Sequence, residues 1–161
     1  MNKKDIRQPY ILLATWFGFG FVPKAPGTWG SAMAIPPGLL LLMLGGVPVL
    51  LIGIVIITAL GFWAAKKFDE AYGTHDSKMI VIDEVAGQWI ALIPVLTASG
   101  LNPILTLLAF GLFRLFDITK PWPASHFDKK IEGPLGVMGD DIVAGIMALL
   151  CLEGIIYVGL V

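Results

Sequence analysis

Residues 31–65 read SAMAIPPGLLLLMLGGVPVLLIGIVIITALGFWAA, an uninterrupted stretch without a single charged side chain. A helix crosses a membrane with about 20 apolar residues, so this stretch of about 35 is too long for one crossing. Gly45, Gly46 and Pro48 divide it, because glycine and proline break helices and favour turns. The stretch therefore predicts two helices, at about 28–44 and 47–66, joined by a tight turn.

The composition of the whole chain supports a membrane protein. Of 161 residues, 57% are hydrophobic and only 14% are charged, whereas a typical soluble domain has about 25% charged residues. The mean hydropathy is +0.82, so lipid must contact much of the surface. We expect one domain spanning residues 1–161. The net charge of -1 gives no indication of nucleic-acid binding, and the single cysteine, Cys151, excludes an intrachain disulfide.

Three further apolar stretches complete the predicted architecture. They cover residues 79–96, 102–116 and 141–161, and a polar connection at 117–140 separates the last two. A shorter apolar stretch at 10–22 follows basic residues and is interpreted as an interfacial or re-entrant helix. The predicted fold class is all-α: a polytopic integral membrane helical bundle with about five membrane helices plus this short N-terminal helix.

The basic residues sort to one side of this predicted bundle. If the N-terminus is cytoplasmic and each of the five stretches crosses once, every lysine and arginine falls at a cytoplasmic end or loop, as the positive-inside rule expects. The opposite turns, 45–48 and 98–103, carry no charge. Four of the lysines are interpreted as determinants of topology and not as ligands. These are Lys24, Lys66, Lys67 and Lys78.

Polar and acidic residues recur near the predicted starts of helices on this same side. They are Thr28 and Ser31, Asp83 and Glu84, and Asp140 and Asp141. A helix N-terminus offers free N–H groups to an anion such as phosphate, and carboxylates bind a hard cation such as Mg²⁺. The alternative is that these side chains only cap the helices and offset their dipoles, which is common.

Asp117 is a stronger functional candidate because it follows the apolar run 105–116. A helix C-terminus repels a carboxylate, so capping does not explain this position. A charged group at the end of a membrane helix needs a partner, for which a metal ion or Arg114 is the best candidate. A plain ion pair with Arg114 or Lys120 is the structural alternative.

Three segments together resemble the family of phosphatidylglycerophosphatase A, a bacterial lipid phosphatase. They are PKAPGTWGSAMAIP at 23–36, HDSKMIVIDEVAGQWI at 75–90, and the region 113–145 with FRLFDITKPWPASHFD and GVMGDDIVAG. Their order and spacing match over nearly the whole chain. The last segment is the most specific of the three. The resemblance implies a Mg²⁺-dependent enzyme of the bacterial inner membrane that cleaves phosphatidylglycerol phosphate to phosphatidylglycerol and phosphate.

The resemblance also implies roles for particular residues. The motif acids fall on Asp76, Asp83, Glu84, Asp117, Asp128, Asp140 and Asp141. The expected metal ligands are Asp83, Glu84, Asp117, Asp140 and Asp141, and the expected catalytic residues are Asp83, Arg114, Asp117, Lys120 and Asp128. The expected substrate-binding residues are Thr28, Gly30, Ser31, Arg114 and Lys120. The implied substrate is a phospholipid in the bilayer, reached from the cytoplasmic side of a multi-pass protein.

The main rival from another class is a small transporter or channel that binds a cation at the acidic cluster. Such sites normally lie near the middle of the membrane on broken helices, where only Glu153 is predicted. Among enzymes, the motifs of haloacid-dehalogenase and histidine-based lipid phosphatases are missing, as is the aspartate-rich run of alcohol phosphatidyltransferases. Whether water or an aspartate attacks phosphorus stays open, and no protein partner is indicated.

Overall fold

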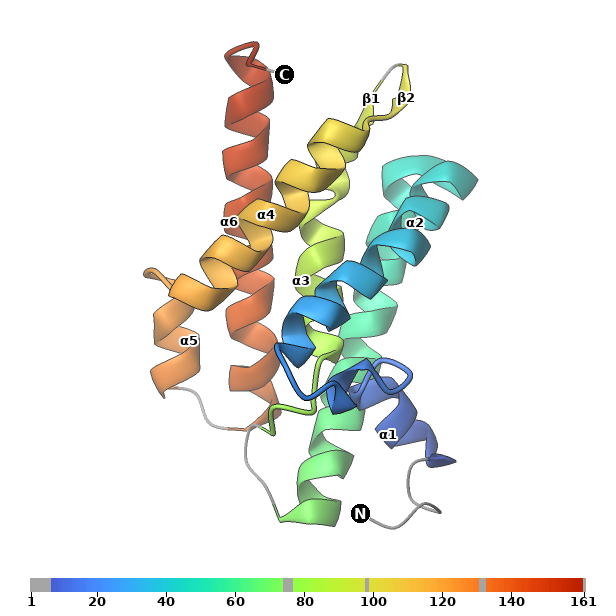
Figure 1. Ribbon diagram of the computed structural model, residues 1–161, viewed down its shortest axis with the longest axis vertical. Helices are drawn as coiled ribbons and strands as arrows, with labels where there is room; N and C mark the ends of the chain where they lie inside the picture. Colours follow the sequence, from blue (N-terminus) through green and yellow to red (C-terminus); the bar gives the residue numbers. More distant parts are fainter. Residues whose placement is uncertain (1–6, 74–76, 98, 131–132, 161) are drawn as a thin grey trace.

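The computed structural model describes residues 7–73, 77–97, 99–130 and 133–160, without the side chains of 128–130 and 134. These residues form a helical bundle with one two-stranded ribbon (Figure 1). The elements are α1 (Pro9–Ala14), η2 (Phe19–Phe21), α2 (Pro26–Tyr72), α3 (Ile82–Ala91), η3 (Ile93–Val95), β1 (Leu96–Thr97), β2 (Gly100–Leu101), α4 (Pro103–Thr119), α5 (Ala124–Lys130) and α6 (Pro134–Tyr157). The all-α prediction is confirmed.

The long helix α2 is a hairpin. Its backbone leaves the helical region at Gly45 and Gly46, and Gly46 has φ +65°, a left-handed value that favours glycine. In Figure 1 the ribbon rises to this point in blue and cyan and descends again in green. The predicted turn in the apolar stretch is therefore confirmed. Pro48 follows the break, where the missing N–H costs little because the new helix is in its first turn.

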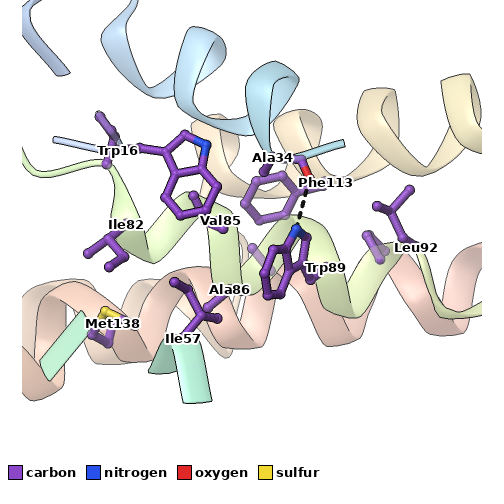
Figure 2. Packing of buried hydrophobic residues seen from close by; sticks show 14 of the residues in the cluster. Trp16, Ala34, Ile57, Ile82, Val85, Ala86, Trp89, Leu92, Phe113 and Met138 are labelled. Atoms are coloured by element: carbon purple, nitrogen blue, oxygen red, sulfur yellow. Dashed lines mark hydrogen bonds between the residues drawn. The ribbon is translucent and has the colours of Figure 1, made fainter. Parts of the chain in front are cut away.

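The short helix α3 lies at the centre of the bundle and contacts α2, α4 and α6 (Figure 1). Nine of its ten residues are buried. Trp89 ties it to the first half of α2, because its indole N–H donates a hydrogen bond of 2.8 Å to the carbonyl of Ala34. Figure 2 shows this bond amid packed side chains that include Trp16, Val85 and Phe113. α3 is thus held on several sides by apolar packing.

α4 and α6 close the bundle around α3. Asn102 caps α4, since its side-chain oxygen accepts hydrogen bonds from the backbone N–H groups of Ile104 and Leu105 at 2.9 and 3.3 Å. This cap and the following Pro103 agree with the predicted helix start. α6 runs alongside α3, with both helices starting at the same end of the bundle (Figure 1).

The structure does not support the predicted count of about five membrane crossings. Two of the described helices, α2 and the segment Leu135–Tyr157, are long and apolar enough to cross a membrane. The predicted crossing at 79–96 is a helix of only ten residues, Ile82–Ala91, which at 1.5 Å per residue is about 15 Å long against a hydrocarbon core of about 30 Å. Pro94 then follows in a 3-10 turn, where a proline fits better than in a helix interior.

Two predicted helix boundaries also need correction. The last helix begins at Pro134, not at Asp141, so Asp140 and Asp141 lie in its second turn. The N-terminal helix covers only residues 9–14 of the 10–22 stretch, and Trp16 and Phe17 then adopt positive φ values. Its residues Ile11 and Ala14 are fully buried. This segment therefore packs on the protein.

Candidate active site

A close approach of α3 and α6 organises the site. A Cβ added at Gly145 would lie 2.4 Å from the carbonyl oxygen of Gly87, and one added at Gly87 would lie 2.5 Å from the carbonyl oxygen of Asp141. Only glycine permits this contact. Asp83 and Asp141 each precede one of these glycines by four residues, which places them on the same helix face one turn earlier. The two carboxylates therefore meet where the helices are closest.

Asp83, Glu84 and Asp141 form the centre of the site. Each offers one carboxylate oxygen, and these oxygens all lie within 4.8 Å of one another. Asp83 and Asp141 are buried, with 8% and 3% of their surface exposed. Asp83 Oδ1 and Glu84 Oε2 are buried without a hydrogen-bond partner among the described atoms. Buried carboxylates in such proximity are costly unless a cation or protons neutralise them.

The pKa values of Asp83 and Glu84 also show that their charged forms are disfavoured at this place. Both begin α3, outside the two segments long enough to cross a membrane. Loss of hydration on burial is the main reason why the pKa of Glu84 rises to about 8, and the charge of Asp141 contributes. Burial, together with the neighbouring charge of Glu84, raises the pKa of Asp83 well above its usual value. A bound divalent cation would reverse this preference for protons.

Two ion pairs flank the three acids. Arg114 Nη1 lies 2.5 Å from Asp117 Oδ2, and the side chains of both residues are mostly buried. Lys120 Nζ lies 2.6 Å from Asp140 Oδ2. Both basic residues come from the end of α4, where Lys120 terminates the helix in a left-handed conformation. Asp117 and Asp140 are near enough to Asp141 for the negative charges of these carboxylates to repel one another. Five acids and two bases thus meet in one place.

The start of α2 completes the base of the site. Ser31 is fully buried; its hydroxyl donates to the carbonyl of Gly27 at 2.8 Å and accepts from Arg114 Nη1 at 3.2 Å. A Cβ added at Gly27 would lie 2.1 Å from Glu84 Oε1. Gly27 is therefore required for the close approach of Glu84, and Ser31 helps to fix the guanidinium of Arg114.

These groups surround a cavity of about 560 Å³. This volume is within the range of about 300–1,000 Å³ that is usual for small-molecule sites. The lining includes all five acids, the paired bases Arg114 and Lys120, a further lysine, apolar residues and the segment 25–27. The residues are Ala25, Pro26, Gly27, Ser77, Lys78, Ile80, Asp83, Glu84, Arg114, Asp117, Ile118, Lys120, Val137, Asp140 and Asp141.

Comparison with known families decides the affiliation. The family model for Phosphatidylglycerophosphatase A matches residues 12–156, which is most of the chain. The chain belongs to the phosphatidylglycerophosphatase A family. It is therefore a phosphoric monoester hydrolase by family, as the sequence motifs predict.

Curated relatives agree with this assignment. The phosphatidylglycerophosphatase A of Haemophilus influenzae is 40% identical over 98% of this chain and 94% of its own length. The corresponding protein of Escherichia coli is 37% identical, covering 97% of this chain and 86% of its own length. A Bacteroides thetaiotaomicron protein provisionally named phosphatidylinositol-3-phosphatase is 36% identical over 87% of this chain and 89% of its own length. No solved structure matches significantly.

The predicted metal ligands of this phosphatidylglycerophosphatase A family member all line the one cavity. Within it, Asp83, Glu84 and Asp141 have the spacing of a shared ion site, whereas Asp117 and Asp140 are paired with Arg114 and Lys120. Because Asp140 and Asp141 lie in the second turn of α6, they are not first-turn caps. The side chain of Asp128, in α5, and all of Asp76 lie outside the described residues.

The predicted substrate-binding residues divide into two groups. Arg114 and Lys120 line the cavity, whereas Thr28, Gly30 and Ser31 do not. A Cβ at Gly30 would instead lie 2.9 Å from the side chain of Val81, so Gly30 allows α2 to pack against the start of α3. Within the segment 23–36, Ala25, Pro26 and Gly27 are the residues that line the cavity.

Sequence reasoning missed one charged residue of the cavity. Lys78 was interpreted as a determinant of topology, but it lines the site. Its position just before the acidic start of α3 was the available signal. The conformation of the loop before α3, which places Lys78 beside the residues of α4 and α6 in the cavity, could not be predicted from the sequence.

Proposed function

We propose that this protein hydrolyses phosphatidylglycerol phosphate to phosphatidylglycerol and inorganic phosphate, as part of phospholipid synthesis. Overall, the P–O bond between the terminal phosphorus and the oxygen of the headgroup glycerol is broken. One water molecule is consumed: its oxygen becomes bonded to phosphorus, and the glycerol oxygen leaves as a hydroxyl group with one proton. The observation that supports this most is the meeting of three clustered carboxylates with Arg114 and Lys120 in one cavity. Family membership and the names of the two phosphatidylglycerophosphatase A relatives favour the same substrate.

The donor set fits Mg²⁺, which we propose as the cofactor. Hard divalent cations take carboxylate oxygens, and Asp83, Glu84 and Asp141 offer three such oxygens close together. The unpartnered Asp83 Oδ1 and Glu84 Oε2 favour an ion at this place. When bound, a divalent ion there would offset the charge of phosphate oxygens and assist attack at phosphorus. Asp117 and Asp140 would complete the ligand set from their positions beside Arg114 and Lys120.

The chain's own cations and amides would hold the phosphate. Arg114 and Lys120 can donate charge-assisted hydrogen bonds to phosphate oxygens, and these bonds strengthen as charge develops in the transition state. Val81, the N-cap residue of α3, makes no side-chain hydrogen bond to the first turn. Among the described residues, an anion in the cavity would therefore compete only with Asp83, which accepts from the backbone of Glu84, for the N–H groups of this turn. Asp117, held against Arg114, would keep the guanidinium directed toward the reacting phosphate.

The lipid would reach the site from the membrane while its acyl chains stay in the bilayer. Large apolar side chains are exposed near the end of α4 and in the turn that follows it, with Leu115 52%, Ile118 69% and Trp122 80% exposed. Ile118 also lines the cavity. The distribution of basic residues favours the cytoplasmic side of the bacterial inner membrane for this end of a multi-pass protein.

Phosphate release from phosphatidylglycerol phosphate in detergent micelles tests the proposal. We expect release with Mg²⁺, none after chelation, and recovery when Mg²⁺ is restored. The transporter alternative predicts movement of a labelled cation into vesicles without phosphate release. It is disfavoured because the acids lie in a cavity beside helix starts, and Glu153 lies exposed in the last part of α6. Absence of phosphate release with Mg²⁺ present would refute the phosphatase proposal.

A further inference from the structure

Lys78 is a third basic residue of the cavity, and it differs from the other two. Arg114 and Lys120 are paired with Asp117 and Asp140, and their side chains are largely shielded. Lys78 is exposed and lines the cavity. It forms no ion pair with any residue that the structure describes. The cavity thus combines buried acids and paired bases with one exposed lysine that makes no ion pair among the described residues.

The loop that carries Lys78 is anchored by its backbone. The N–H of Ile80 donates to the carbonyl of Ser77 at 2.8 Å, which closes a turn around Lys78 and Met79. The N–H of Val81 donates to the carbonyl of Ala14 at 2.8 Å, so the N-terminal segment supports the loop. This support is tight, because a Cβ at Gly20 would lie 2.0 Å from the carbonyl oxygen of Met79. The backbone at Lys78 therefore has a defined place beside the cavity.

The proposed substrate carries a second anionic group that could pair with the ammonium group of Lys78. Phosphatidylglycerol phosphate carries a terminal phosphomonoester, which is cleaved, and an internal phosphodiester nearer the acyl chains. If the monoester lies among Arg114, Lys120 and the acids, the diester must lie closer to the mouth. An anionic diester there would be repelled by the five acids unless a cation faced it.

We propose that Lys78 binds the phosphodiester of the lipid substrate and so distinguishes a phosphorylated phospholipid headgroup from a simple phosphomonoester. This inference rests on the proposed function, because it takes its second anionic group from that substrate. Lys78 acts in binding: it contacts the part of the substrate that does not react. Its removal should therefore raise KM and leave kcat nearly unchanged.

Product inhibition of the protein in neutral detergent micelles separates the two halves of the substrate. Phosphatidylglycerol retains the diester, and inorganic phosphate retains only the cleaved group. For Lys78→Gln we expect KM for phosphatidylglycerol phosphate and the inhibition constant of phosphatidylglycerol to rise about fivefold, the size of a partly exposed charge pair. The inhibition constant of phosphate should stay unchanged, and Lys78→Arg should restore most of the affinity.

Lys67→Gln is the matched control, because Lys67 is an exposed lysine whose partner is Glu70 on α2, at 3.2 Å, and it does not line the cavity. An unchanged inhibition constant of phosphatidylglycerol in Lys78→Gln would overturn the inference. So would an equal rise for both products, which would indicate general attraction of anions. In either case the native chain would still release phosphate, and the proposed function would stand. Absence of release by the native chain would refute both.

Discussion

Ser31 shows how a residue can serve the site without touching it. The sequence places it in a motif suggestive of phosphate binding, but its hydroxyl is fully buried between the carbonyl of Gly27 and the guanidinium of Arg114. Arg114 Nη1 thus has two partners, Ser31 and Asp117. A guanidinium with fixed orientation stabilises a developing charge better than one that must reorganise.

Replacing Ser31 with alanine tests this positioning role. The loss of one hydrogen bond to Arg114 should lower kcat about tenfold, leave KM within about twofold, and reduce the free energy of unfolding by about 1 kcal/mol. Phosphate-release kinetics and thermal unfolding in detergent would measure these effects. Thr58→Ala, in the second half of α2, is the control and should change neither kcat nor KM. A larger effect on KM than on kcat would instead support direct contact with the substrate.

At the level of single residues, the sequence indicated which side chains belong to the site but not which of them contact one another. Acids next to helix starts indicated a cation site, and Asp117 at the end of an apolar helix required a partner. The sequence could not decide whether the partner of Asp117 is a metal ion or Arg114, because the choice depends on the positions of the side chains in α4. The positive-inside rule accounts for Lys78 without a specific contact, so the sequence did not show that this residue also lines the cavity.

Among the elements, the parallel contact of α3 with α6 does most to create the site. Gly87 and Gly145 remove the Cβ atoms that would keep the two backbones apart. The same contact brings Asp83 and Asp141 together one turn earlier. The spacing of four residues between acid and glycine recurs in both helices, so the sequence contained the pattern, but nothing in it showed that these two helices are neighbours.

Gly87→Ala should therefore damage the site through the backbone. Its Cβ would lie 2.4 Å from Phe113 Cε2 and 2.5 Å from the carbonyl oxygen of Asp141. Such overpacking costs about 1–3 kcal/mol of stability, and we expect phosphate release to fall more than tenfold as Asp83 and Asp141 separate. Gly111→Ala in α4 is the control, because no atom lies within 4 Å of the added Cβ. Normal activity and stability of Gly87→Ala would contradict this role of the helix contact.

The helix boundaries were predicted unevenly, for a physical reason. The turn at Gly45–Gly46 and the cap at Asn102 are local features, which the sequence encodes directly. α3 is short because Pro94 and its position among three other helices limit it. α6 begins before Asp141 because Val137 and Met138 are buried against neighbouring elements. Hydropathy alone does not distinguish a helix buried in protein from one that crosses lipid.

For the whole molecule, the distribution of charge predicts two distinct sides. The end of the bundle that holds the cavity should face the cytoplasm, and the β1–β2 ribbon should face the opposite side. The hairpin shape of α2 fits this prediction, because its two halves return the chain to the cavity end (Figure 1).

Cysteine labelling of intact cells tests the orientation. In a Cys151→Ala background, we expect a membrane-impermeant maleimide to label Ser99→Cys from outside the inner membrane and Lys24→Cys only after the membrane is opened. Ser99 and Lys24 are both exposed in the structure, so burial would not explain a difference. Labelling of both positions from the same side would contradict the predicted orientation.

The central claim is that Asp83, Glu84 and Asp141 share one divalent ion beside the reacting phosphate. Its most direct test is titration of the purified protein in detergent with Mn²⁺, a paramagnetic substitute for Mg²⁺, followed by electron paramagnetic resonance. The account predicts saturable binding by the native chain and by Glu153→Gln, and loss of more than tenfold in affinity in Asp83→Asn and in Asp141→Asn. Native affinity in both aspartate variants would contradict it.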